Sequence, residues 1–254
     1  MPEVATLPPP PRPAPPAVAP GTAETHQEPT FHPDWSWVDV TVPPRAMEVD
    51  GFVDWYVSGE FPTGMRVSLV NGNLVLEPMA DELFTHNALK TVVAAMLLSY
   101  AEQTEAGRVF GDGALYAHRP TGPANEADAT FLTYDSLRSG RVSYAEHPDR
   151  GVTVIHGAAD LVVECVSNSS VRKDTVGLRE AYLAAGVREY WILDGRGETL
   201  GFTLLSRADD PDEWAETTET YPVSPLLNRR VRIERQIDPL GDPNWKARLE
   251  SADA

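Results

Sequence analysis

The chain has 254 residues, of which 42% are hydrophobic, and its 38 acidic against 21 basic residues give a net charge of −17. A chain of this size can bury one sizeable core with appendages, or at most two small domains. The excess of acid argues against a protein that coats nucleic acid, because such proteins bind phosphates mainly with Lys and Arg. The single cysteine excludes an internal disulfide framework and a cysteine-rich zinc site.

The first 35 residues contain 11 of the 23 prolines. Proline fixes φ and removes a backbone donor, so residues 1–35 are predicted to form a disordered, proline-rich tail. They lack the basic start and the apolar run of a secretory signal. The longest apolar run, residues 92–98, is too short for a membrane span, which needs about 20 residues. We therefore expect a soluble, cytoplasmic protein that does not associate with membranes.

Residues 49–57 have the scattered apolar and aromatic pattern of a short helix. Two alternating segments follow, residues 66–70 and 73–76, and Asn71-Gly72 joins them. Asparagine followed by glycine between alternating segments is the strongest short-range signal of a β-hairpin. The sequence therefore predicts a helix followed by a hairpin.

The next helix is expected at residues 86–100, where apolar side chains at helical spacing form one stripe. We expect Gly107 to close this helix, because glycine is favoured just after a helix end. Residues 109–110 and 114–116 are predicted to be short strands around a glycine-rich turn.

Two further strands are expected at residues 127–133 and 160–167. Asp174 then fits the N-cap of a helix, because its carboxylate can accept from free backbone amides, and Gly186 fits the residue just after that helix. Residues 189–193 follow as another buried strand. This order of strand, helix and strand predicts a right-handed crossover between two parallel strands.

The strand at residues 160–167 carries an acid among apolar residues. Glu164 shares one face with Val162 and Val166, and the opposite face is apolar as well. Such a strand is typically buried on both faces, where an unpaired carboxylate is costly. A divalent cation, a Lys or Arg partner, or a raised pKa would each neutralise Glu164. The alternative is an edge strand whose Glu164 faces water.

Asp128 presents the same problem, because the sequence becomes apolar directly after it. By itself, Asp128 fits a surface residue at the start of a strand more often than a ligand. Two carboxylates on neighbouring strands, however, make a suitable site for Mg²⁺, which prefers oxygen ligands and keeps several waters. Such a metal activates water and stabilises the charge that develops on a phosphate.

Residues 160–194 read DLVVECVSNSSVRKDTVGLREAYLAAGVREYWILD. This segment resembles the central block of the Uma-type family, whose members are described as putative restriction endonucleases of the PD-(D/E)XK superfamily. Residues 68–72 are similar to the family's opening hairpin, and Ala127-Asp128 occupies its Pro-Asp position. The resemblance spans about residues 65–205. It implies an α/β, restriction-endonuclease-like fold, with a mixed sheet flanked by helices and an N-terminal β-hairpin extension.

Three segments follow from these patterns. Residues 1–35 are the tail, and residues 36–205 are expected to form the restriction-endonuclease-like domain. Residues 206–254 are a C-terminal extension, whose structure the sequence leaves open. Residues 200–205 and 231–233 suggest further strands near and beyond the domain boundary.

The resemblance implies that Asp128 and Glu164 bind Mg²⁺ or Mn²⁺. The family's usual lysine follows the Asp174 position by four residues, but Leu178 stands there in this chain. A lysine at such a site orients the attacking water and stabilises negative charge. We expect Lys173, directly before the helix, to replace it, with Arg179 as the second candidate.

Two residues near the start of the first long helix complete the expected site. His86 matches a histidine of the family and is expected to contact the scissile phosphate or a metal-bound water. The alternative for His86 is a structural hydrogen bond to the backbone at the helix start. Glu82 is a further candidate acid on the same approach.

The sequence thus favours a metal-dependent endonuclease that hydrolyses phosphodiester bonds in DNA through a local contact. One alternative is an interaction module with a nuclease-like fold and no turnover, which Leu178 and the acidic surface favour. Another keeps the metal site but acts on a phosphoester outside nucleic acids. Whether the chain forms a homodimer is left open.

Overall fold

A computed structural model describes residues 40–62, 64–78, 82–119, 122–147 and 151–253. The tail expected at residues 1–35 lies outside the described residues. Residues 41–254 form one compact unit. In the described part of this unit, no helix combines the length and the apolar character that a membrane span requires.

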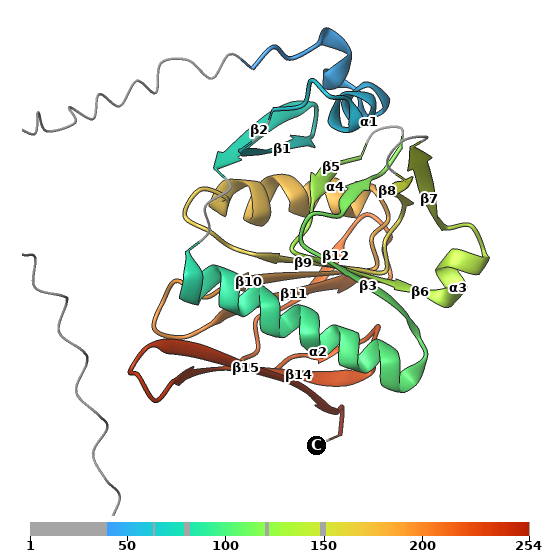
Figure 1. Ribbon diagram of the computed structural model, residues 1–254. Coiled ribbons are helices and arrows are strands. Elements are labelled where there is room, and N and C mark those ends of the chain that lie inside the picture. Colours follow the sequence, from blue (N-terminus) through green and yellow to red (C-terminus); the bar gives the residue numbers. More distant parts are fainter. Residues whose placement is uncertain (1–39, 63, 79–81, 120–121, 148–150, 254) are drawn as a thin grey trace, which may run out of the picture. The chain divides into compact units, whose positions relative to one another are not determined.

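The described strands form two six-stranded sheets and one three-stranded sheet (Figure 1). The first sheet has the order β2-β1-β5-β4-β8-β7, with β4 parallel to β8 and the other neighbours antiparallel. Its strands are β1 (Met65–Val70), β2 (Asn73–Pro78), β4 (Leu115–Ala117), β5 (Ala124–Glu126), β7 (Val142–His147) and β8 (Gly151–Gly157).

The N-terminal hairpin of the first sheet is confirmed. β1 and β2 pair from Met65 opposite Pro78 to Val70 opposite Asn73. The two residues between them, Asn71 and Gly72, have φ values of 50° and 72°. Positive φ at both positions is the reason that Asn-Gly suits a two-residue hairpin turn.

The second sheet has the order β12-β11-β10-β9-β6-β3. Its strands are β3 (Gly107–Gly111), β6 (Ala129–Thr133), β9 (Leu161–Cys165), β10 (Glu189–Asp194), β11 (Gly201–Arg207) and β12 (Trp214–Thr217). β9 and β10 are parallel, and the chain between them forms a helix, as the sequence predicts. β9 lies inside the sheet, between β10 and β6, and every residue of it is buried.

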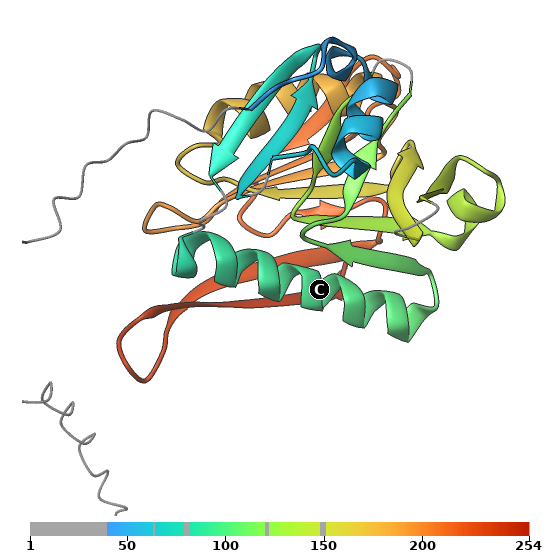
Figure 2. The same ribbon diagram turned by 45° about the horizontal axis from the view of Figure 1, so that its top comes forward.

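Helices cover the sheets. They are α1 (Val49–Val57), α2 (Ala88–Thr104), α3 (Tyr134–Arg138) and α4 (Leu178–Ala184), with a 3₁₀ turn at Pro44–Met47 and π-helical turns at Leu83–Asn87 and Lys173–Gly177. α2 and α4 lie on opposite faces of the second sheet (Figures 1 and 2). The α/β class and the mixed sheet flanked by helices are therefore confirmed.

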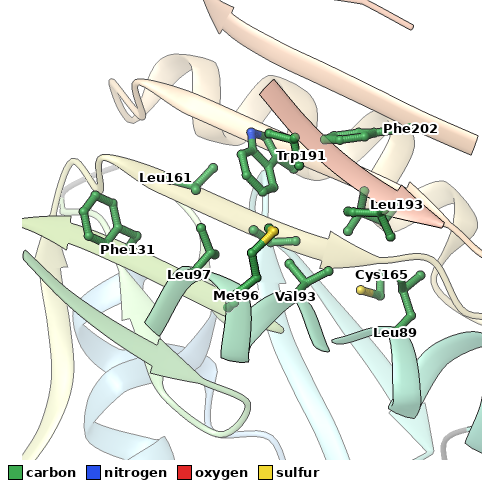
Figure 3. Packing of buried hydrophobic residues seen from close by; sticks show 14 of the residues in the cluster. Leu89, Val93, Met96, Leu97, Phe131, Leu161, Cys165, Trp191, Leu193 and Phe202 are labelled. Carbon is green, nitrogen blue, oxygen red and sulfur yellow. The ribbon is translucent and has the colours of Figure 1, made fainter. Parts of the chain in front are cut away.

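Two apolar clusters hold these layers together. One lies between α2 and the second sheet and contains Leu89, Val93, Leu97, Leu161 and Trp191, which Figure 3 shows packed together. The other lies on the α4 face. Because the inner strands bury both of their faces, they carry nearly continuous apolar runs.

The C-terminal residues add a small antiparallel sheet in the order β13-β14-β15. Its strands are β13 (Val223–Ser224), β14 (Arg229–Ile237) and β15 (Pro243–Ser251). Val231, Ile233 and Trp245 from this sheet belong to the same cluster as α2. The region that the sequence left open thus contributes to the core, and β14 includes the strand suggested at residues 231–233.

Two local expectations are wrong, and a third is confirmed. α2 ends at Thr104, Glu105 adopts the left-handed conformation after it, and Gly107 begins β3 instead of closing the helix. The short strands expected around the glycine turn are confirmed as β3 and β4, and they belong to different sheets. Asp174 is not an N-cap, because the helix has begun by residue 171 and the Asp174 amide already donates to the Ser170 carbonyl.

Candidate active site

The pairing of β6 with β9 brings two acids together. These strands are antiparallel, and Ala129 lies opposite Val163. Asp128 directly precedes β6, and Glu164 directly follows Val163, so the same register places the two acids opposite each other. Opposite positions of an antiparallel pair bring side chains close together. The site therefore originates in a strand pairing between segments far apart in the sequence.

Glu164 is buried, with 2% of its surface exposed. Its Oε1 accepts hydrogen bonds from Asn125 Nδ2 at 3.0 Å and from the Tyr182 hydroxyl at 3.1 Å. Its Oε2 makes no hydrogen bond to the described residues and is therefore available as a ligand. The alternative of a water-facing Glu164 on an edge strand is wrong, because β9 lies inside its sheet.

Asp128 is also buried, with 4% of its surface exposed. Its Oδ2 accepts from the Cys165 amide at 2.7 Å, which fixes the carboxylate against β9. His86 Nε2 lies 3.6 Å from the same oxygen, and Lys90 Nζ lies 3.8 Å from Oδ1. His86 therefore lies beside the first expected metal ligand, as the functional alternative for this histidine requires.

Lys173 reaches the site from the π-helical turn that precedes α4. Its Nζ donates to Glu77 Oε2 at 2.7 Å and lies 3.5 Å from Asp174 Oδ1. Burial favours a neutral amine, but the negative charges of Glu164, Asp174 and Glu77 outweigh it and raise the pKa of Lys173. Lys173 is therefore a fixed cation at neutral pH and cannot serve as a general base.

A small cavity of about 20 Å³ lies between these side chains. Its lining includes Asp128, Glu164, Lys173, His86, Glu77 and Arg66. A cavity needs roughly 10–15 Å³ to hold one water, so this space fits a single water or a small ion. Among the residues that the structure describes, no three His, Cys, Asp or Glu side chains gather as a ready metal site. Two carboxylates are nevertheless a fitting donor set for Mg²⁺, which binds through one or two of them and keeps waters.

The two carboxylates hold their protons more firmly than in water. Burial raises the pKa of Asp128, and it raises the pKa of Glu164 well above its ordinary value. The nearby charges of Asp174, Asp128 and Glu77 raise the pKa of Glu164 further, whereas Lys173 lowers it. Because a cation must displace these protons, its affinity for the site is expected to rise with pH.

Two sequence candidates lie outside this cavity. Arg179 is partly exposed on α4 and forms an ion pair with Glu216 of β12 at 2.5 Å. Glu82 is exposed, and its carboxylate accepts from the amide and hydroxyl of Thr85 at the start of the π-helical turn. Leu178, at the family's lysine position, is buried in the α4 cluster. Of the basic candidates considered, the structure brings Lys173 into the cavity.

Sequence reasoning missed five residues of the site: Glu77, Lys90, Asn125, Asp174 and Tyr182. Glu77 and Lys173 are 96 positions apart, so no local pattern indicates their contact. Tyr182 lies eight residues after Asp174, within the segment that resembles the family's central block. The Tyr182 hydroxyl bonds both Asn125 Oδ1 and Glu164 Oε1. It therefore links α4 to the buried carboxylate.

Asp174 gives a prediction about stability. Burial raises its pKa to about 7, against the opposing effect of Lys173. A carboxyl group with a raised folded-state pKa binds more protons when folded, so its contribution to stability is lost as the pH rises from about 4 to 7. We expect Asp174→Asn to remove that loss. The quantity to compare is the free energy of unfolding of the variant minus that of the native protein, measured in chelator. This difference should increase by more than about 1 kcal/mol between pH 4 and pH 8.

Urea denaturation at several pH values measures this difference. Asp135→Asn is the control, because Asp135 is exposed on α3. A difference between Asp174→Asn and the native protein that stays constant across this pH range would contradict the prediction.

Comparisons with known proteins give one family match and one structural match. A family model, Uma2, described as "Putative restriction endonuclease", matches residues 49–227. A solved structure from Anabaena variabilis ATCC 29413, described as a putative nuclease belonging to DUF820, matches with a TM-score of 0.47 and 15% sequence identity. That match covers 70% of this chain and 88% of the other. A search of curated proteins found no match.

Proposed function

Because the chain belongs to the Uma2 family of restriction-endonuclease-type proteins, we propose that it is a Mg²⁺- or Mn²⁺-dependent endonuclease that hydrolyses phosphodiester bonds in DNA. The observation that supports this activity most directly is the cavity that Asp128, Glu164 and Lys173 line together. It combines two oxygen ligands with one fixed cation. This combination suits the cleavage of an anionic ester by water.

Asp128 and Glu164 would hold the metal ion. The Cys165 amide fixes one carboxylate, and Asn125 with Tyr182 fixes the other, so both are oriented before a ligand arrives. When bound, a divalent ion lowers the pKa of a coordinated water and stabilises charge on the phosphate. The hydrogen-bond partners of the carboxylates limit the rearrangement that binding requires.

Lys173 and His86 would act on the phosphate and water. The ammonium of Lys173 keeps its proton, so it stabilises negative charge and positions the water by donating hydrogen bonds. His86 lies beside Asp128 Oδ2 and lines the same cavity, where it can contact the phosphate or a water on that ligand. Neither role needs the lysine that Leu178 replaces.

One observation favours the alternative of an inactive interaction module. Lys173 is already bound to Glu77 at 2.7 Å, so its ammonium is shared between a structural ion pair and the cavity. If Glu77 held it completely, the Lys173 ammonium would not be available to the phosphate or the water. The two functions therefore differ in turnover and not in fold.

Plasmid nicking together with metal titration tests the proposal. We expect the full-length protein to nick supercoiled DNA with Mg²⁺ or Mn²⁺, to be inactive in chelator, and to bind the metal more tightly as the pH rises. Neither metal binding nor cleavage on single- or double-stranded DNA would establish the inactive module. Metal binding without DNA cleavage would support a phosphoesterase with another substrate.

A further inference from the structure

A groove of aromatic and arginine side chains runs along the edge strand β3 toward the cavity. It consists of two hollows, one of about 370 Å³ and one of about 480 Å³, which share Tyr144. The first hollow is lined by Arg108, Tyr134 and Arg138, and the second by Phe110 and Tyr56. We call these six residues the Tyr144 groove. α3 contacts both β3 and β7, which places the two walls of the first hollow side by side.

The charge of the groove differs from that of the whole chain. The chain has 38 acidic against 21 basic residues, yet the first hollow is lined by two arginines and no acid. Arg108 is exposed and lies beside the hydroxyls of Tyr144 and Tyr134, which raise the pKa of its guanidinium. Arg138 stacks over the Tyr134 ring at 5.6 Å. Arg138 also forms an ion pair with Asp135 at 3.0 Å, so the positive charge of the first hollow comes mainly from Arg108. The groove is thus an aromatic strip that carries positive charge at Arg108.

The groove ends close to the proposed catalytic cavity, because Gly111 at the end of β3 pairs with Ala129, the residue after Asp128. Asp112 follows β3 and lines the second hollow. Its carboxylate binds Arg66 at 3.0 Å and Lys90 at 3.0 Å, so its charge is neutralised. Arg66 lines the catalytic cavity, and Lys90 Nζ lies 3.8 Å from Asp128 Oδ1. Only the side chains of Arg66 and Lys90 therefore separate this end of the groove from the expected metal ligands.

We infer that the Tyr144 groove binds single-stranded DNA and guides one strand into the catalytic cavity. This inference rests on the proposed function and names its substrate class. Unpaired bases expose their faces and stack on Tyr and Phe rings, whereas the bases of a duplex are already stacked on each other. A duplex would need many Lys and Arg contacts to its phosphates, and this groove offers two arginines. Arg108, which is exposed, is placed to contact a phosphate between stacked bases.

Fluorescence anisotropy with a labelled oligodeoxythymidine of about 12 nucleotides, a length within the span of one or two such sites, tests the inference. The titration is made in chelator, so that the strand stays intact, and it is repeated with a mixed-sequence strand and its duplex. We expect the single strand to bind more tightly than the duplex. Tyr134→Ala should weaken single-strand binding roughly 5- to 100-fold through the lost stacking.

Arg108→Ala should weaken binding and reduce the slope of log affinity against log salt by about 0.7, the value for one phosphate contact on a single strand. Lys246→Ala removes one exposed cation from β15, and Tyr221→Ala removes a tyrosine that stacks with Arg232; neither residue lines the groove. Both control variants should bind like the native protein. Because Arg108 is exposed, its variant remains informative even if Tyr134→Ala does not fold.

Equal or tighter binding of the duplex, or native affinity in both groove variants, would overturn the inference. Its failure is distinguishable from failure of the proposed function. If the native protein cleaves DNA but the groove variants bind single strands as tightly as it does, the inference about the groove is refuted and the proposed nuclease function is retained. Single-strand binding that depends on Tyr134 and Arg108, without cleavage in Mg²⁺ or Mn²⁺, supports the groove and refutes the nuclease.

Discussion

Glu164→Gln is expected to abolish DNA cleavage and the stabilisation by Mg²⁺ or Mn²⁺, while the fold is kept. Glutamine has the shape of glutamate, and its amide oxygen can still accept from Asn125 and Tyr182 in place of Oε1. The change removes the charge that a cation needs. Burial raises the pKa of Glu164, so the charged form destabilises the folded protein as the pH rises above the ordinary value. In chelator at neutral pH, the variant should therefore be at least as stable as the native protein.

Thermal unfolding with and without metal gives a readout that does not depend on activity. A ligand present at 100 times its dissociation constant stabilises the folded state by about 2.7 kcal/mol. The native protein should show such a shift, and Glu164→Gln should not. Glu164→Ala is less informative about the metal, because it leaves the buried Asn125 amide without this acceptor and removes one of the two acceptors of the Tyr182 hydroxyl.

Glu189→Gln is the matched control. Glu189 is buried in the neighbouring strand β10, and burial raises its pKa as well. Its partners are Trp191, Ser224 and the Leu226 amide, and it does not line the cavity. The control should keep both cleavage and the metal-dependent shift. An unchanged shift in Glu164→Gln would refute the metal assignment.

The features that could be predicted from the sequence are local. Asn71-Gly72 specifies the hairpin because both residues tolerate positive φ. The burial of Glu164 follows from the apolar residues on both faces of its strand. The parallel pairing of β9 with β10 follows from the length of the helical connection between them.

The missed features depend on pairings between distant segments. Asn125 belongs to β5, a strand of three residues that has no alternating pattern to read. Asp174 was expected to cap the helix, because an acid near a helix start is usually a cap. Here the helix begins earlier, so Asp174 lies within it and its side chain is buried. Glu77 lies near the end of the hairpin, where a polar residue is common. Only its ion pair with Lys173 shows that it belongs to the site. These contacts arise only when the two sheets and α4 come together.

Lys173 is the residue on which catalysis is expected to depend most after the metal ligands. Lys173→Met keeps the length of the side chain and removes the ammonium. Losing one preorganised electrostatic group typically reduces the rate by about 100- to 1000-fold, and we expect a loss of this size in plasmid nicking. Arg179→Ala is the control, because Arg179 pairs with Glu216 outside the cavity and should leave nicking unchanged.

A structural role for Lys173 must be separated from a catalytic one, because Lys173→Met leaves the buried Glu77 unpaired. Breaking a buried ion pair by removing one partner destabilises a protein by roughly 3–5 kcal/mol. The double variant Lys173→Met, Glu77→Gln removes one cation and one anion, so the net charge around the cavity is kept and no carboxylate is left alone at that position. We expect this variant to recover stability and most of the metal affinity but not the nicking activity, since ammonium groups do not ligate metals. Recovery of nicking together with stability would show that Lys173 acts only by neutralising Glu77. Native activity in Lys173→Met with a loss in Arg179→Ala would instead make Arg179 the substitute for the family's lysine.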